Sequence, residues 1–131
     1  MIKAIILDFD GVIVNTDPFH FNSWKKVLRH YDIKIKFNQK DYNLIKGFSR
    51  SVTLSKIIQS YNIQKVEPKL ISEILQKKNE FFLKSIRSIS KENLIPGVEE
   101  FIVNNKGIYK IGVASASANA TFILEKIGMI N

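Results

Sequence analysis

Two aspartates two residues apart, Asp8 and Asp10, are the side chains best suited to chemistry in this sequence. They follow a short apolar run, residues 2–7 (IKAIIL), and Gly11 comes directly after them. Two nearby carboxylates bind a hard cation such as Mg²⁺ through oxygen, and one can attack an electrophile while the other handles a proton. A solvated strand-to-loop turn is the alternative, which the apolar run before the pair and Gly-Val after it disfavour.

Ser115 stands in a comparable position after a second apolar run, residues 108–114 (IYKIGVA). Both runs are typical of strands buried on both faces of a parallel sheet. Open α/β sheets bind ligands at the carboxyl ends of their strands, so Asp8 and Asp10 reach one crevice if Asp8 keeps strand geometry. Taken alone, a serine such as Ser115 more often only leads into a helix.

The elements that must position these residues alternate between strand and helix. Helical patterns fill the stretch between the two strands, and they start at Asp17–Pro18, Asn38, Ser49 and Pro68. Four helices in about 70 residues predict a small bundle, entered through residues 11–16 and left through residues 88–97. Further helices are expected after Pro96–Gly97 and after residues 114–120. The pattern predicts a layered α/β protein with a helical insertion after its first strand.

Length and composition restrict the class of protein. The chain has 131 residues, of which 45% are hydrophobic and 24% are charged, as in one soluble globular domain. It has no cysteine, which excludes disulfides and thiolate zinc sites, and its two histidines disfavour a histidine-built metal site. No apolar run of about 18 residues predicts a membrane span, and the start lacks the order of a signal peptide. We therefore expect a cytoplasmic protein, with no membrane partner and with any metal held by carboxylate oxygens.

The net charge of +8 is confined to one part of the sequence. Residues 16–93 carry sixteen Lys or Arg against seven Asp or Glu, whereas the remainder carries four against five. The basic residues are scattered along amphipathic helical patterns, and Ile and Asn are also abundant, as AT-rich coding produces. We interpret the surplus as solvated helix faces, with attraction for anionic substrates as the alternative. No nucleic-acid-binding motif appears, so nucleic acid is not an expected partner.

The string DFDGVIVNT, residues 8–16, resembles the first motif (DxDGxxxDT/S) of the haloacid dehalogenase superfamily of phosphoryl-transfer enzymes. Asn15 stands where that motif often has an acidic residue. The resemblance implies that Asp8 attacks phosphorus to form an aspartyl phosphate and that Asp10 is the general acid and base. It also implies Mg²⁺, held by Asp8 and by the backbone carbonyl of Asp10.

The same superfamily has a second motif, a Ser or Thr at the end of the next sheet strand, which Ser115 matches. The implied role is to hold phosphoryl oxygens, and the N-terminus of the following helix is an expected anion site. The implied fold is α/β, a partial Rossmann-like core of residues 1–15 and 94–131 with a four-helix cap domain inserted at residues 16–93.

The helical insertion resembles the small cap of the β-phosphoglucomutase-like group, as do the strings TDPFHFNSW (16–24), KGFSR (46–50) and ASAS (114–117). This resemblance implies phosphoryl transfer between the 1- and 6-positions of β-glucose phosphates, with two phosphates held at once and water excluded when the cap closes. Arg50 would bind the non-transferring phosphate, and His20 would help to align Asp10. The implied substrate-binding residues are His20, Trp24, Gly47, Phe48, Ser49, Arg50, Lys78, Asn79, Ser117 and Asn119.

Several of these residues have a simpler interpretation. Ser49 and Arg50 can be no more than the first turn of a helix, His20 can be a surface or satisfied histidine, and Trp24 is more typical of a bundle core. Lys78 and Asn79 can equally be exposed-face residues. Ala118 stands where the group often has a basic residue, which weakens the expected phosphate site there.

The superfamily has two further motifs, a lysine and an acidic pair that completes the Mg²⁺ shell, and both belong after Asn131. Two strands cannot cover both edges of residues 2–7, since a core of this type has about five strands. We therefore expect exposed apolar edge and face. We also expect little turnover by the 131 residues unless a C-terminal half is supplied.

Three functions follow from these patterns. The first is phosphoryl transfer on a phosphorylated sugar, by a fragment, a truncated product or a half that another chain complements, with self-association through the exposed sheet as a further possibility. The second is a related phosphatase acting on phosphoglycolate or a sugar phosphate. The third is a non-catalytic binding or assembly module. The KGFSR and ASAS strings favour the first over the second.

Overall fold

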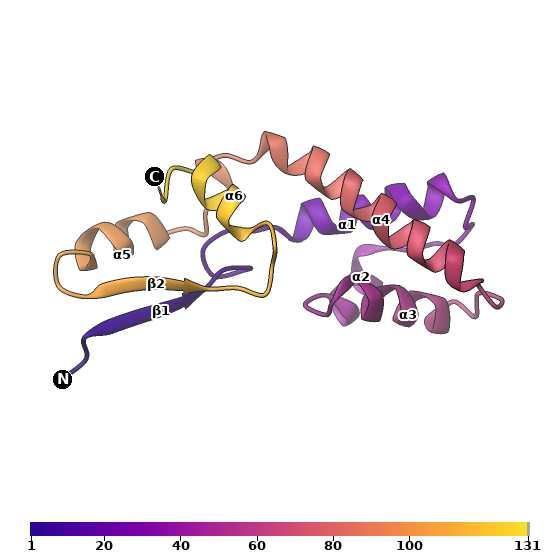
Figure 1. The fold of residues 1–131 in the computed structure, drawn as a ribbon, viewed down its shortest axis with the longest axis horizontal. Coiled ribbons are helices and arrows are strands. Elements are labelled where there is room, and N and C mark those ends of the chain that lie inside the picture. The colour runs from indigo at the N-terminus through magenta and orange to yellow at the C-terminus, as the bar shows by residue number, and fades with distance from the viewer. Residues whose placement is uncertain (131) are drawn as a thin grey trace. The chain divides into compact units, whose positions relative to one another are not determined.

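The computed structural model describes residues 1–130, which fall into two compact units. The first, which we call the α/β unit, comprises Met1–Asp17 and the chain from Ile86 onward. The second, the helical unit, comprises Pro18–Ser85. The helical unit is thus inserted into the α/β unit after the first strand (Figure 1).

Two parallel strands, β1 (Ala4–Asp8) and β2 (Lys110–Ala114), pair so that Ala4 lies opposite Lys110 and Asp8 opposite Ala114. Within residues 1–130 they make up the whole sheet. Each strand begins two residues later than the apolar run that predicted it. Asp8 is the last residue of β1, so it keeps the strand geometry that a shared crevice with Asp10 requires.

The helices of the α/β unit are α5 (Val98–Asn105) and α6 (Ala120–Lys126), with two 3-10 turns, η1 (Ile86–Ser88) and η2 (Lys91–Asn93). Ile86, predicted inside the preceding helix, lies in η1. Figure 1 shows α5 and α6 on the same side of the two strands. Gly97, before α5, has φ 85°, and Gly128, after α6, has φ 73°. Both glycines stand at the helix boundaries that the sequence predicts.

The prediction that β1 is buried on both faces is wrong. Ile5 and Leu7 are half-buried, whereas Ile6 between them is 73% exposed. This alternation follows from the one-sided covering of the sheet, because successive side chains of a strand point to opposite faces. Exposure of apolar sheet surface, also expected from the sequence, is therefore observed.

The helical unit contains α1 (Asp17–His30), α2 (Gln39–Ile45), α3 (Arg50–Ser60) and α4 (Pro68–Ser85). The Asn38 side chain accepts hydrogen bonds from the backbone of Lys40 and Asp41 at the start of α2, and Ser49 accepts one from Val52 at the start of α3. These caps satisfy backbone donors that a helix leaves unpaired, as the sequence predicts. The core is formed by Trp24, Val27, Leu28, Phe37, Tyr42, Ile45, Leu54, Ile57 and Ile74.

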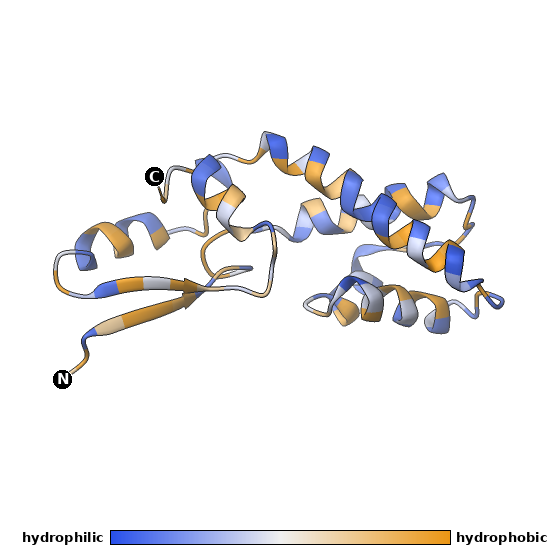
Figure 2. Cartoon of the chain, in the orientation of Figure 1, coloured by the Kyte–Doolittle hydropathy of each residue, from blue (hydrophilic) through white to orange (hydrophobic). Residues whose placement is uncertain are grey.

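The hydropathy of the residues agrees with a core on one side of each long helix. Figure 2 shows hydrophobic and hydrophilic residues alternating around the long helices α1 and α4, as expected for helices with one buried side. In residues 1–130, none of the helices combines the length and the apolar character that crossing a membrane requires.

Candidate active site

The turn after β1 holds the two aspartates in a fixed local geometry. Phe9, between them, is fully buried, as is Ile13, and the Ile13 amide donates to the Phe9 carbonyl (3.0 Å). Gly11 has φ 74°, a conformation that favours glycine, and its amide donates to the Val14 carbonyl (2.9 Å). The buried Phe9 and Ile13 anchor the turn, while Asp8 and Asp10 remain exposed to solvent.

Each aspartate has one carboxylate oxygen engaged within the turn. Asp8 Oδ1 accepts a hydrogen bond from the Phe9 amide (2.7 Å). Asp10 Oδ1 accepts one from the buried Thr16 hydroxyl (2.5 Å). These bonds restrict rotation of both side chains and leave a second oxygen on each carboxylate for a ligand.

The donor set of this turn fits Mg²⁺ in part. Mg²⁺ is usually bound by one or two carboxylates together with waters and substrate phosphate. Asp8 offers an exposed carboxylate, and the backbone bonds of the turn occupy the carbonyls of Phe9 and Val14 rather than that of Asp10. Among residues 1–130 there is no group of three or more His, Cys, Asp or Glu that could form a closed metal cage. An ion here would depend on water and on further ligands.

Ser115 follows β2 directly, and the parallel register puts the end of β2 beside the end of β1. Its Oγ accepts a hydrogen bond from the Ser117 amide (3.0 Å), and Ser117 Oγ accepts one from the Asn119 amide (3.2 Å). Two successive serine turns therefore lead from the strand to α6. The structure thus brings Asp8 and Ser115 to the same edge of the sheet, and it places Ser117 and Asn119 in the connection that follows.

The helical unit gathers three of the sequence-predicted residues, His20, Trp24 and Lys78, into a second cluster. Lys78 Nζ lies 2.8 Å from His20 Nδ1, 5.3 Å from the centre of the Trp24 ring and 4.9 Å from that of Phe82. The His20 ring stacks on Phe82 at 4.1 Å with an interplanar angle of 6°. Lys78 is 1% exposed, so the alternative that it is an exposed-face residue is wrong. Asn79, its neighbour, is half-buried.

Burial changes the acid–base properties of this cluster. Burial, and then the charge of Arg50, lowers the pKa of Lys78 to about 7. Burial, followed by the charges of Lys78 and Arg50, lowers the pKa of His20 to about 3. His20 is therefore neutral near pH 7. When Lys78 is charged it can only donate, so His20 Nδ1 accepts and its proton resides on Nε2.

Arg50, whose charge contributes to the lowered pKa of both Lys78 and His20, begins α3 and is exposed. One of its terminal nitrogens, Nη1, donates to the Leu75 carbonyl (3.3 Å), which ties α3 to α4. The residues before it are also exposed. Gly47 has φ 87°, and Phe48 is 53% exposed with Lys56 Nζ 4.6 Å from its ring centre. Ser49 has the capping role that its simpler interpretation predicts, and Trp24 lies in the bundle core.

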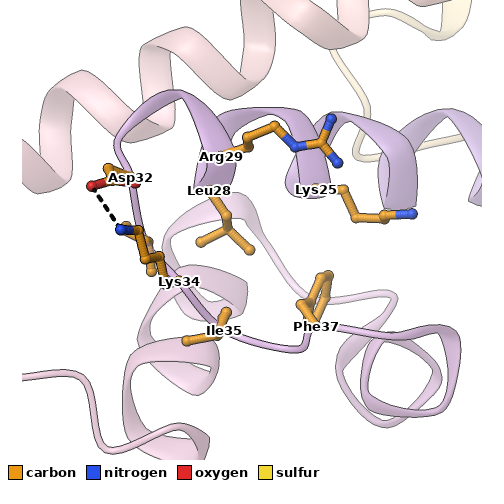
Figure 3. A pocket seen from close by; sticks show the side chains of 8 residues that line it. Lys25, Leu28, Arg29, Asp32, Lys34, Ile35 and Phe37 are labelled. Atoms are coloured by element: carbon orange, nitrogen blue, oxygen red, sulfur yellow. Dashed lines mark ion pairs between the residues drawn. The ribbon is translucent and has the colours of Figure 1, made fainter.

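Two residues of these clusters were not singled out from the sequence. Thr16 donates a hydrogen bond to Asp10. Its position as the last residue of the DFDGVIVNT string could have identified it from the sequence. Phe82 stacks on His20, and its signal was only an apolar position in a helical pattern. A separate groove of the helical unit has apolar Leu28, Ile35 and Phe37 in its lining and contains none of the predicted site residues (Figure 3).

The sequence pattern of the haloacid dehalogenase-like hydrolases matches residues 5–130. The chain belongs to this family. Its fold is accordingly a haloacid dehalogenase-like α/β fold with a small parallel sheet and an inserted four-helix unit.

Within the family, the similarity extends to β-phosphoglucomutases. The β-phosphoglucomutase of Bacillus subtilis (strain 168) is 33% identical over 138 residues, which cover 98% of this chain and 57% of that protein. The crystal structure of β-phosphoglucomutase from Clostridium difficile has a TM-score of 0.84 and 31% identity, with 98% of this chain and 57% of that chain covered. The chain therefore spans a little over half the length of these relatives.

A third relative shows the fold alone. The crystal structure of a predicted phosphoglycolate phosphatase from Haemophilus somnus 129PT has a TM-score of 0.82 but only 18% identity, with coverage of 98% and 58%. The same arrangement of strands and helices therefore occurs in proteins with divergent sequences.

Proposed function

We propose that this chain takes part in phosphoryl transfer on a phosphorylated sugar, with Asp8 as the nucleophile and Asp10 as the general acid and base. The proposal rests on the adjacent carboxyl ends of β1 and β2, where Asp8 lies opposite Ala114 and Ser115 comes directly after Ala114. An exposed carboxylate beside a hydroxyl, at the carboxyl edge of parallel strands, suits attack on a phosphoryl group.

Asp8 has the features of a positioned nucleophile. Its Oδ1 is held by the Phe9 amide, which leaves Oδ2 to attack phosphorus and to carry the phosphoryl group as an aspartyl phosphate. Asp10, oriented by Thr16, would give a proton to the leaving oxygen and then take one from the incoming hydroxyl. Ser115 would donate to a phosphoryl oxygen. These roles require that the two aspartates keep separate orientations, and the two hydrogen bonds support this requirement.

Mg²⁺, held by the Asp8 carboxylate and the Asp10 backbone carbonyl, would neutralise negative charge on the transferring group when bound. Among its described residues the chain has no group of three or more His, Cys, Asp or Glu that could hold the ion, so water and substrate phosphate would supply further ligands.

The helical unit would act as the cap, with residues 16–93 as its proposed bounds and residues 1–15 and 94–131 as those of the core. Arg50 supports this role because its guanidinium is exposed and always charged, and its charge lowers the pKa of the buried Lys78 and of His20. It would bind the non-transferring phosphate, with Gly47, Phe48 and Ser49 beside the sugar. The cap would close over the core, exclude water and bring His20 to help align Asp10.

The substrate we propose is β-glucose 1-phosphate, with glucose 6-phosphate as the product, because the identity to the Bacillus subtilis β-phosphoglucomutase reaches 33%. The test supplies this chain with the part of that enzyme outside the matched 57%, which we call the complementing polypeptide. We expect Mg²⁺-dependent formation of glucose 6-phosphate, which the Asp8→Asn variant abolishes.

Each other result favours a different function. Release of inorganic phosphate from many phosphate esters, without glucose 6-phosphate, would identify a phosphatase instead. Full activity of the Asp8→Asn variant would remove the nucleophile assignment. Absence of turnover, together with salt-resistant capture of one partner by the Asp8→Asn chain, would favour a binding module.

A further inference from the structure

The imidazole ring of His20 is contacted by two side chains of α4. Its face stacks on the ring of Phe82, with 4.1 Å between the ring centres and 6° between the planes. Its Nδ1 lies 2.8 Å from the ammonium nitrogen of Lys78. Residues 78 and 82 are four apart on one helix, so they share a face, and both are buried. One face of α4 therefore contacts both the flat side and an edge of the His20 ring.

The stack restricts the torsion that decides where the ring nitrogens point. Rotation about the Cβ–Cγ bond of histidine is broad, unlike the staggered torsions of aliphatic side chains. A half-turn about that bond exchanges Nδ1 with Cδ2, and Lys78 would then face a carbon in place of an acceptor. The path to that half-turn passes through a ring perpendicular to Phe82, and perpendicular rings need centres roughly 4.5–7 Å apart. At 4.1 Å the buried Phe82 ring blocks this rotation.

His30, the second histidine of the chain, has a looser arrangement. It is exposed at the end of α1, and it meets Phe81 at 5.9 Å and 77° and Tyr31 at 4.9 Å and 86°. Both contacts are edge-on, and at these distances a ring can turn. Phe81 and Phe82 are neighbours on α4, so the chain itself provides a stacked pair and an edge-on pair for comparison.

We propose that Phe82 is the positioning residue of His20: its ring fixes the imidazole plane, so that Lys78 meets Nδ1 and the Nε2 proton points away from Lys78 as a donor. This inference deepens the proposed function, on which it rests, because His20 is there the cap residue that helps to align Asp10. A neutral imidazole held in one tautomer offers a single N–H to a carboxylate, whereas a rotating ring also presents carbon atoms. Phe82 acts only through His20 and touches no reacting atom.

The first measurement is imidazole ¹⁵N NMR on the 131-residue chain, which has only two histidines. At about pH 6 His20 is neutral and Lys78 is charged, because their pKa values are about 3 and about 7. We expect one His20 tautomer in the unaltered chain, with well-separated shifts for a protonated Nε2 and an unprotonated Nδ1. In Phe82→Leu, which removes the flat ring, the two shifts should move toward each other as both tautomers form. Phe82→Tyr retains the ring and should keep the shifts apart.

Phe81→Leu is the matched control, since it removes an aromatic ring from the neighbouring position of α4. It should leave the His20 shifts unchanged, and any change should fall on His30. Circular dichroism of each variant separates loss of folding from loss of positioning. If Phe82→Leu does not fold, Phe82→Met takes its place, because the unbranched methionine side chain fills irregular space in a core.

The second measurement uses the complex of the chain with the complementing polypeptide. Phe82→Leu should lower kcat about tenfold and change KM less than about twofold, because a misplaced donor weakens transition-state stabilisation rather than binding. Phe82→Tyr should retain most of kcat.

The two measurements separate this inference from the proposed function. An unchanged His20 spectrum in Phe82→Leu would overturn the inference, even in an active complex. A changed spectrum with unchanged kcat would also overturn it, because His20 would then need no positioning. A changed spectrum in a complex without any turnover would support the positioning by Phe82 and would count against the proposed function instead.

Discussion

Lys78 Nζ lies 2.8 Å from His20 Nδ1 inside the helical unit, so two basic side chains share one buried site. Within residues 1–130 neither side chain is paired with a carboxylate, and the aromatic rings of Trp24 and Phe82 lie against the ammonium group instead. A charge in such surroundings is costly, and its cost depends on pH.

The first prediction concerns the pH dependence of stability. Burial lowers the pKa of Lys78 from 10.5 to about 7, so between pH 7 and 10.5 the unfolded chain binds a proton that the folded chain lacks. The free energy of unfolding should therefore rise with pH across this window, by about 2 kcal/mol between pH 7 and 9. Lys78→Met should remove this rise. The measurement is urea unfolding followed by fluorescence of Trp24, the single tryptophan. Parallel pH profiles of the two proteins would contradict it.

The second prediction concerns Arg50, whose charge also lowers the pKa of Lys78. Arg50→Met should raise that pKa and move the onset of the stability rise to higher pH. NMR titration of the Lys78 side chain provides a direct measurement. Arg29→Met is the control, because Arg29 is exposed in α1 and does not contribute to the shift. An unchanged pKa in Arg50→Met would show that burial alone sets it.

The sequence predicted the helices better than it predicted the environment of individual side chains. Asn38 and Ser49 were recognisable as caps because capping depends on residues three apart in sequence, and the structure confirms both. The position of Asp8 at the end of β1 was likewise predictable from the apolar run before it. Such features are local.

The predictions that were wrong concern burial, which depends on packing between residues far apart in the sequence. Lysine is typical of exposed helix faces, and Lys78 is buried only because it packs against His20 and Trp24. Ile6 belongs to an apolar run that reads as a strand covered on both sides, yet the described residues place helices on one side only. Sequence periodicity shows which residues can be buried, but not whether a partner element is present.

The third prediction tests the hydrogen bond from Thr16 to Asp10. Thr16→Val keeps the volume of the buried side chain but removes the donor, so we expect a loss of about 1 kcal/mol in unfolding free energy. If Asp10 is the general acid, kcat of the complex with the complementing polypeptide should fall more than KM changes. Thr16→Ser retains the hydroxyl and should retain most of kcat. Equal kcat in the Val and Ser variants would show that this bond does not orient the acid.

The fourth prediction concerns the turn between the aspartates. Gly11 has φ 74°, where residues with a Cβ are strained, although open space surrounds the position. Gly11→Ala should therefore destabilise the α/β unit by about 1 kcal/mol through backbone strain alone. Gly112→Ala, at a position equally free of neighbours and with no such φ, is the control. Thermal unfolding of both variants gives the comparison. Equal melting temperatures for the two would show that the turn tolerates the substitution.

The most direct test of the account is to trap the phosphoryl group on Asp8. The chain, in complex with the complementing polypeptide, is incubated with β-glucose 1,6-bisphosphate and Mg²⁺ and then reduced with borohydride, which converts an aspartyl phosphate to homoserine with loss of phosphate. Peptide mass spectrometry should find homoserine at position 8 in the unaltered chain and none in Asp8→Asn. Homoserine at another aspartate, or none in a complex shown to have formed, would contradict the assignment of Asp8 as the nucleophile.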